Sequence, residues 1–206
     1  MEKIAIIGYS GHALVVLDAC KKTNINVNYY CGSPRINDNP YNLIYLGDES
    51  NEQFDWDNID AFVLGVGSNK IRNKVSNLIQ SKGKKNLNVI HPVSILNDGV
   101  KMGTGNLIAT NVVINPFAQI GNDCIINTGA IIEHECKIGN AVHIAPGTVL
   151  AGNVTVGNGA FIGANSVLKQ GITIGENATV GAGSVVLENI PNDEVWVGNP
   201  AKKLIK

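Results

Sequence analysis

The triplet Glu133-His134-Glu135 contains the residue types best suited to chemistry in this sequence. It follows apolar and small residues in a repetitive region, where three ionisable side chains would lower stability unless they had a role. An adjacent carboxylate can orient an imidazole and raise its basicity, as a general base requires. His143, nine residues later, could line the same groove. The triplet therefore predicts acid–base catalysis by His134, with exposed corner positions as the alternative for both histidines.

A zinc site is the competing interpretation of these histidines. Carbonic anhydrases of the γ class hold zinc with three histidines on a β-helix, and imidazole is a common zinc ligand. Here only His134 and His143 lie in the repetitive region, because His91 precedes it and is expected to be structural. The spacing gives no support for a metal. The carboxylates beside His134 favour acid–base chemistry, and we expect no metal.

A glycine-rich turn near the amino terminus could bind a phosphate. Residues 3–8 are expected to form a strand and residues 11–20 a helix. Ser10, Gly11 and His12 would then lie at the amino terminus of the helix, where backbone N–H groups attract anions. A tight turn without a ligand is the alternative for this loop.

A second glycine-rich strand end, from Gly65 to Asn69, supports ligand binding by the first half of the chain. The carboxyl ends of neighbouring strands form the usual ligand crevice of an open α/β sheet. The glycine spacing does not match a dinucleotide fingerprint, and the second expected strand ends in Tyr30-Cys31-Gly32 without an acid. An NAD(P) enzyme is therefore not expected.

The first half as a whole alternates between strands and helices. This pattern predicts a small, parallel, Rossmann-like α/β domain over residues 1–91. The expected strands are residues 3–8, 27–30, 61–66 and 89–90, and the expected helices are residues 11–20 and 69–82.

The second half contains a repeat of six residues. An aliphatic residue recurs at every sixth position from Met102 to Val186, without one insertion. A period of six suits neither a helix of 3.6 residues per turn nor a simple alternating strand. It fits a prism of short parallel strands with Gly and Asn at the corners, where a left-handed backbone is needed. Each coil buries its apolar side by stacking on the next. We therefore predict an all-β, left-handed parallel β-helix over residues 92–206.

The composition excludes several classes of function. The net charge of −1 lacks the basic excess that nucleic-acid binding needs. No apolar run is long enough to span a bilayer, and the amino terminus has the pattern of a strand rather than a signal peptide. Cys124 and Cys136 occupy equivalent small core positions of the repeat, which fits a reducing compartment. We expect a cytoplasmic protein with no membrane span and no nucleic-acid partner.

The sequence also resembles the sugar-nucleotide acetyltransferases of the bacillosamine and perosamine N-acetyltransferase type, within the hexapeptide-repeat superfamily. The sialic acid O-acetyltransferases share the same plan. The resemblance covers essentially the whole chain. It rests on GYSGHA at 8–13, GVGSNKIRNKV at 65–75, IHP at 90–92, NTGAIIEHECKIG at 127–139, HIAPGTVLAGNV at 143–154 and VGNPAKKL at 197–204.

The resemblance implies a homotrimer that binds acetyl-CoA, the co-substrate, between neighbouring β-helices. It makes His134 the catalytic base and Glu135 the residue that tunes it. The implied acetyl-CoA contacts are Asn127, His143, Gly152, Ala164 and Ala182, and the implied nucleotide-sugar contacts are Ser10, Gly11, His12, Gly65 and Asn69.

The implied reaction is N-acetylation of the 4-amino group of a nucleotide-linked 4-amino-4,6-dideoxy sugar, for surface glycan or O-antigen synthesis. Many relatives carry acidic residues just after the second strand, whereas this chain has Tyr30-Cys31-Gly32 there. The nucleotide is therefore open among UDP, dTDP and GDP. A sugar O-acetyltransferase is the nearest alternative. A zinc lyase and a non-catalytic nucleotide-sugar sensor are more distant ones.

Overall fold

The computed structural model of the chain describes residues 2–32 and 39–205. Its first part is a parallel five-stranded sheet in the order β3-β2-β1-β4-β5. The expected α/β unit is thus confirmed except for its expected strand at residues 89–90, which pairs with a strand of the β-helix instead. Strands β3 and β5 are additional to the expected ones, because two-residue strands leave no periodic pattern. The elements are β1 (Ile4–Ile7), α1 (Gly11–Lys22), β2 (Val27–Cys31), β3 (Ile44–Tyr45), the 3-10 helix η1 (Trp56–Asn58), β4 (Ala61–Leu64), α2 (Asn69–Ser81) and β5 (Lys85–Asn86).

The two α-helices pack against opposite faces of this sheet. Successive strand residues point to opposite faces. Ile6 of β1 shares a buried cluster with Leu17 of α1, whereas Ile7 shares a different cluster with Val75 and Ile79 of α2. Neither α-helix within the described residues has the length and apolarity needed to cross a membrane.

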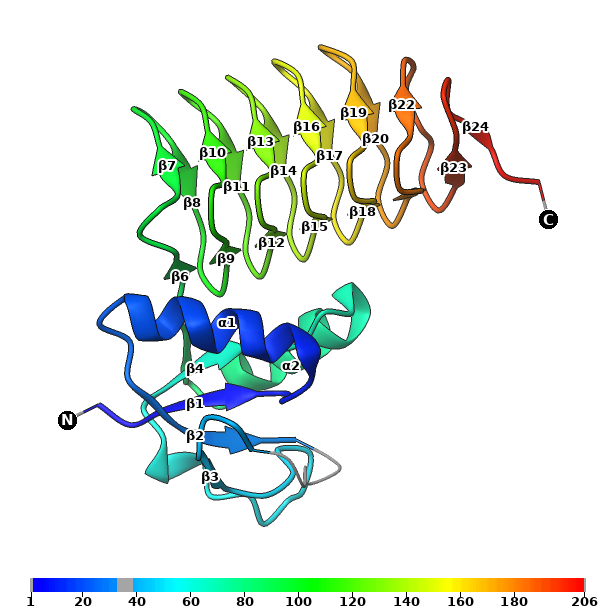
Figure 1. Cartoon of the computed structure of the whole chain (residues 1–206). Coiled ribbons are helices and arrows are strands. Elements are labelled where there is room, and N and C mark those ends of the chain that lie inside the picture. Colours follow the sequence, from blue (N-terminus) through cyan, green and yellow to red (C-terminus); the bar gives the residue numbers. More distant parts are fainter. Residues whose placement is uncertain (1, 33–38, 206) are drawn as a thin grey trace.

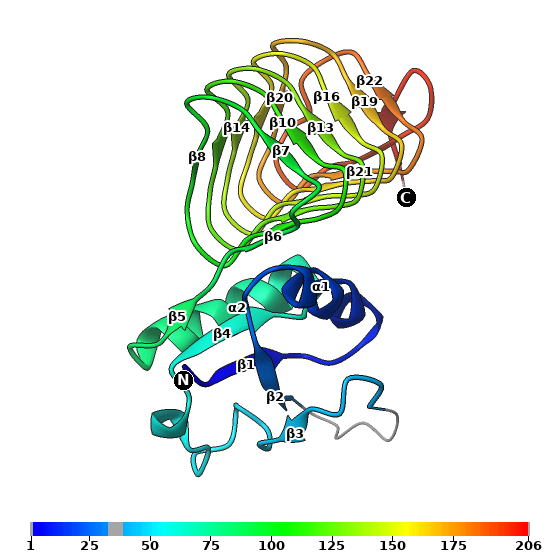
Figure 2. The same cartoon turned by 60° about the vertical axis from the view of Figure 1, so that its left-hand side comes forward.

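The second part is a left-handed parallel β-helix that stands over the helices of the α/β domain (Figures 1 and 2). Strands pair with strands one coil, or 18 residues, further on, as Ile114 does with Ile132. The strands are β6 (Val89–Ile90), β7 (Ile95–Leu96), β8 (Lys101–Met102), β9 (Leu107–Ile108), β10 (Val113–Ile114), β11 (Gln119–Ile120), β12 (Ile125–Ile126), β13 (Ile131–Ile132), β14 (Lys137–Ile138), β15 (His143–Ile144), β16 (Val149–Leu150), β17 (Thr155–Val156), β18 (Phe161–Ile162), β19 (Val167–Leu168), β20 (Thr173–Ile174), β21 (Thr179–Val180), β22 (Val185–Val186), β23 (Val195–Val197) and β24 (Lys202–Lys203).

The β-helix has three faces, which we name by what lies on them. The domain face, toward the α/β domain, holds β6, β9, β12, β15, β18, β21, β23 and β24. The apolar face holds β7, β10, β13, β16, β19 and β22, and its outward residues are all Ile or Val. The polar face holds β8, β11, β14, β17 and β20, whose outward residues are Lys, Gln or Thr. The three faces therefore differ in what they can contact.

The repeat determines both the core and the corners of the β-helix. The second residue of each repeat strand points inward, and Ile126, Ile132 and Leu150 are fully buried. Cys124 and Cys136 lie buried at small core positions, as expected. Most non-glycine corner residues with positive φ are Asn or Asp, which tolerate this backbone at low cost. Glu135 is an exception at φ +60°, so a residue costly for this conformation lies next to His134.

The chain passes from one sheet system to the other between Asn86 and Val89. Asn86 ends β5 of the α/β sheet, while β6 already pairs with β9 on the domain face. The strand ladder of the β-helix thus begins a few residues before position 92, where the sequence suggested a boundary. The reason is visible in the repeat itself, because the period of six continues backward from Met102 through Leu96 to Ile90.

Candidate active site

The predicted site residues of the β-helix lie along two different edges. Asn127, Ala164 and Ala182 occupy corners between the domain face and the apolar face, which we call the first edge. The corners between the apolar face and the polar face form the second edge and carry His134, Glu135 and Gly152. Within one chain, the apolar face therefore separates the predicted base from most of the predicted acetyl-CoA contacts.

The second edge carries an imidazole paired with a carboxylate. His134 Nδ1 lies 3.2 Å from Glu135 Oε2, and the two side chains are 53% and 64% exposed. A carboxylate at Nδ1 favours the tautomer with the proton on that nitrogen, which leaves Nε2 to accept a proton. This geometry is the one a general base needs.

The His134 ring lies directly beside Gly152, where there is no room for a side chain. A Cβ at position 152 would come within 2.6 Å of both Cε1 and Nε2 of His134. Because the obstacle is the end of an exposed side chain, the ring would move and the backbone would not. Glycine at this corner thus sets the position of the predicted base.

Replacing Gly152 with alanine should therefore displace His134 without unfolding the protein. We expect acetyl transfer to fall about 10-fold or more, since small misplacements of catalytic groups are costly, while the thermal midpoint stays close to that of the wild type. Gly171→Ala is unsuitable as a control because Gly171 has φ +74°. Ala151→Gly removes a methyl group from the residue next to Gly152 and so controls for changes in the local backbone. Equal rates in wild type and Gly152→Ala would contradict this role.

The first edge and the domain face bring Asn127 to His143. Asn127 Oδ1 accepts a hydrogen bond from the N–H of Thr128 at 2.8 Å, so its amide nitrogen faces His143 Nε2 at 3.2 Å. An amide that donates to Nε2 makes that nitrogen the acceptor of a neutral imidazole. Burial, followed by the charge of Arg72 and by His12, lowers the pKa of His143 from 6.5 to about 4. His143 is thus held neutral at ordinary pH.

His12 extends from the α/β domain to this same point. Its ring centroid lies 6.3 Å from that of His143, and Phe161 packs edge-on against His143 with the ring centroids 5.1 Å apart. Burial and the charge of Arg72 lower the pKa of His12 to about 4. Its Nε2 is buried and has no hydrogen-bond partner among the described residues. The glycine-rich turn thus joins the predicted nucleotide region to the domain face.

These two histidines predict a loss of stability in acid. Both have a lower pKa in the folded protein than in the unfolded chain, so the unfolded chain binds more protons between about pH 6.5 and 4. The free energy of unfolding should therefore fall as the pH drops through this range. Urea denaturation at pH 7 and pH 5 measures this change, and His143→Gln should reduce it. A pH dependence identical in wild type and variant would contradict the assignment.

The carboxyl ends of β1, β2 and β4 enclose a crevice of about 470 Å³ in the α/β domain. Gly8, Ser10 and Gly65 line it, together with Gly32 and Glu49. Gly65 is required by close packing, because a Cβ there would lie 2.2 Å from the carbonyl oxygen of Gly8. Ser10 and Gly65 thus lie together as expected, while Gly11 and His12 begin the helix beside them.

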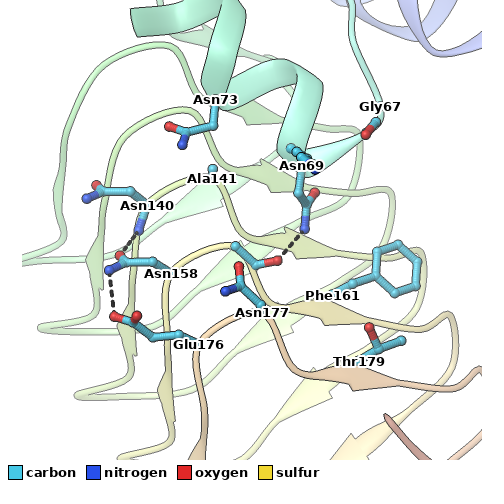
Figure 3. A pocket seen from close by; sticks show the side chains of 13 residues that line it. Gly67, Asn69, Asn73, Asn140, Ala141, Asn158, Phe161, Glu176, Asn177 and Thr179 are labelled. Carbon is cyan, nitrogen blue, oxygen red and sulfur yellow. Dashed lines mark hydrogen bonds between the residues drawn. The ribbon is translucent and has the colours of Figure 1, made fainter. Parts of the chain in front are cut away.

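Asn69 does not line this crevice. It begins α2 and points toward the β-helix, where its amide nitrogen donates to the carbonyl oxygens of Gly159 and Ala160, each at 3.0 Å. Figure 3 shows it beside a separate cavity of about 890 Å³ between α2 and the domain face, where Phe161 also lies. Asn69 therefore connects the two domains in the single chain.

Arg72 is a residue of this junction that the sequence reasoning did not single out. Its side chain is 1% exposed and lies between the two domains. It lies within the motif at 65–75 that carries the resemblance, but its burial was not foreseen because an arginine on an amphipathic helix normally faces solvent. Its donors reach Asp123 O (2.7 Å), Val66 O (3.2 Å), Gly67 O (3.0 Å), Asn69 Oδ1 (2.9 Å), Ala141 O (3.1 Å) and Val142 O (3.3 Å). One guanidinium thus holds the loop beside the crevice against the residues that precede His143.

Comparison with known proteins agrees with this architecture. The family described as "PglD N-terminal domain" matches residues 3–79, and "Bacterial transferase hexapeptide (six repeats)" matches residues 117–152 and 153–188. A search of the curated proteins found no match. No group of three or more potential metal ligands occurs in the part of the chain that the structure describes.

Three similar solved structures are relevant. PerB from Caulobacter crescentus, in complex with CoA and GDP-perosamine, is 31% identical over 99% of this chain and 98% of its own, with a TM-score of 0.91. A histidine-to-asparagine variant of the perosamine N-acetyltransferase from the same organism, also with CoA and GDP-perosamine, is 30% identical over 100% and 98%, with a TM-score of 0.92. The acetyltransferase domain of PglB from Neisseria gonorrhoeae, in complex with acetyl coenzyme A, is 28% identical over 98% and 99%, with a TM-score of 0.91.

These likenesses extend over both domains, because each match covers at least 98% of this chain. The chain therefore belongs to the hexapeptide-repeat sugar-nucleotide acetyltransferases that carry a PglD-type N-terminal domain.

Proposed function

We propose that the protein transfers the acetyl group of acetyl-CoA to the 4-amino group of a nucleotide-linked 4-amino-4,6-dideoxy sugar, in the cytoplasm and for surface glycan synthesis. Residues 1–91 would bind the nucleotide-sugar and residues 92–206 acetyl-CoA. The observation that carries the proposal is the pairing of His134 with Glu135 on a β-helix of the acyltransferase type. The α/β domain of the same chain has an open crevice at the carboxyl ends of its strands. The solved relatives that hold both CoA and GDP-perosamine support it.

The two proton transfers of the reaction can be assigned to His134 of this chain. Nε2 of His134 removes a proton from the sugar amine as the nitrogen attacks the thioester carbonyl. The carbonyl becomes a tetrahedral oxyanion, and donors in the groove stabilise it. The intermediate then collapses, the C–S bond breaks and the CoA thiolate leaves. Protonated His134 returns the proton to the thiolate, so the products are the amide and CoA. Neutral His143 and Asn127 would contact the acetyl group.

Because the apolar face separates the two edges within one chain, a complete active site needs a second copy of the chain. Packing of the β-helices around a threefold axis is heterologous, so the first edge of one chain would meet the second edge of the next. The apolar face between the edges supports this arrangement. Its outward side chains form one row of β-branched residues, of which Ile95 is 55% and Val167 43% exposed in the single chain. A homotrimer would cover this row and complete the active site from two subunits.

A charge on the apolar face should therefore dissociate the trimer. Val149→Lys should shift the molar mass measured by light scattering from three chains to one, and activity should be lost with it, because each site needs two chains. Thr155→Lys on the polar face is the matched control and should stay trimeric and active, since both positions are outward and partly buried. A trimeric Val149→Lys variant would contradict the use of this face.

The reaction is tested by release of free thiol from acetyl-CoA in the presence of UDP-, dTDP- and GDP-linked amino sugars. We expect thiol release with a 4-amino sugar and none with the corresponding 4-hydroxy sugar. Release only with the hydroxyl compound would make the protein an O-acetyltransferase. No release with any acceptor would refute the proposed reaction.

A further inference from the structure

The crevice of the α/β domain contains a carboxylate that the reaction above does not use. Glu49 follows β3 and lines the crevice next to Cys31 and Gly32 at the carboxyl end of β2. Two contacts hold its segment there. The N–H of Gly32 donates to Gly47 O at 3.0 Å, and the hydroxyl of Tyr45 donates to Gly32 O at 3.0 Å. The chain after β3 thus folds back over the end of β2.

One oxygen of this carboxylate lacks a partner within residues 2–32 and 39–205. Glu49 Oε2 is buried and makes no hydrogen bond among the described residues. Burial, and after it the neighbouring carboxylate of Asp48, raises the pKa of Glu49, against a hydrogen bond from its own backbone. Glu52, three residues further on, is exposed and does not line the crevice. A buried acceptor without a donor is rare in a folded protein, and a ligand that donates to it is a physical reason for its presence.

The place of Glu49 in the sheet indicates what that ligand donates. In open α/β sheets that bind nucleotides, the phosphates lie at the first glycine-rich turn, and an acid near the end of the second strand accepts hydrogen bonds from the ribose hydroxyls. Here the turn from Gly8 to Gly11 is present, but β2 ends at Cys31 and is followed by Gly32, so neither position carries an acid. Glu49 reaches the same end of β2 from the neighbouring strand. The crevice, about 470 Å³, is large enough for a nucleoside.

We propose that Glu49 binds the ribose hydroxyls of the nucleotide and so selects a ribonucleotide over a 2′-deoxyribonucleotide. This inference rests on the proposed function, because it concerns the nucleotide of the same substrate. It points to UDP or GDP rather than dTDP as the carrier of the sugar. A site that hydrogen-bonds a hydroxyl rejects the analogue that lacks it, because the protein acceptor is then left unpaired.

Direct binding of nucleoside diphosphates tests this inference without acetyl transfer. Calorimetry of the whole protein with UDP, dUDP, GDP and dGDP should show that whichever base binds, its ribose form binds on the order of 10-fold or more tighter than its deoxyribose form. Glu49→Ala should bring this ratio close to one. The isosteric Glu49→Gln, which keeps the shape of the site, should give an intermediate ratio. Glu52→Ala, with the same change of charge on an exposed residue of the same segment, should keep the wild-type ratio.

Three results would overturn the inference. They are equal binding of ribose and deoxyribose forms by the wild type, a wild-type ratio that persists in both Glu49 variants, and a change in preference between uracil and guanine without a change in the ribose ratio. The third result would mean that the Glu49 carboxylate binds the base instead of the ribose. Failure of the proposed reaction would look different, because nucleotides would bind with the expected ratio while no acceptor released thiol from acetyl-CoA.

Discussion

Replacing His134 with alanine should lower kcat by on the order of 10²-fold or more, because proton removal by a positioned base contributes a factor of this size. The remaining activity would come from positioning of the two substrates and from the nucleophilicity of the amine itself, which needs less activation than a hydroxyl. Because the His134 side chain is half exposed and, within the described part of the chain, is hydrogen-bonded only to Glu135, the thermal midpoint should hardly change. Thiol release under saturating acetyl-CoA and acceptor measures kcat.

The two glutamates of the triplet provide matched controls. Glu135→Gln keeps the shape of the pair but removes the carboxylate that orients His134 through Nδ1, so it should lower kcat, though less than His134→Ala does. Glu133→Gln removes the same charge from a residue whose side chain is not hydrogen-bonded to His134, and it should leave kcat close to that of the wild type. An unchanged kcat in His134→Ala would remove His134 from the mechanism.

Replacing Arg72 with methionine should lower the free energy of unfolding by about 3 kcal/mol and reduce kcat/KM about 10-fold or more. The guanidinium is buried and bonds to five backbone carbonyls and one side-chain amide, which would all lose a donor. Its partners include Gly67 beside the crevice and Val142 next to His143. Loss of the guanidinium would therefore let the loop at Gly67 move relative to His143. Urea denaturation at one fixed protein concentration and steady-state kinetics measure the two effects.

Ser76→Ala separates positioning by Arg72 from simple loss of stability. Ser76 lies one turn further along α2 in the same junction, fully buried, and its hydroxyl bonds to Asp123 Oδ2 at 2.6 Å and to Asn86 Nδ2 at 2.7 Å. The hydrogen bonds of its hydroxyl do not extend to the loop at Gly67 or to the strand of His143. This variant should lose stability and keep its kcat/KM. If both variants lost kcat/KM in proportion to stability, Arg72 would be a structural residue only.

The β-helix was predictable because its cause is local and repeated. Each six-residue unit carries the inward aliphatic side chain and the small or corner residue that its own strand and turn require. Stacking repeats the same strand-and-corner arrangement from one coil to the next. The two helices and the longer strands of the α/β domain follow equally from short-range patterns, and the turn at Ser10 follows from its glycines. The short strands β3 and β5 escaped prediction because two residues cannot show a period.

The sequence by itself determined the scaffold, the reactive triplet and the glycine-rich turns, since these depend on residues within one coil or one turn of each other. Only the tertiary structure decided which of those residues meet. It placed His134 and His143 on different sides of the β-helix, joined the domains through the buried guanidinium of Arg72, and brought Glu49 to the end of β2. The hydrogen bonds of Arg72 to the β-helix join residues 51 to 70 positions apart. Such pairings depend on how whole elements pack, and no short-range pattern of charge or hydrophobicity records them.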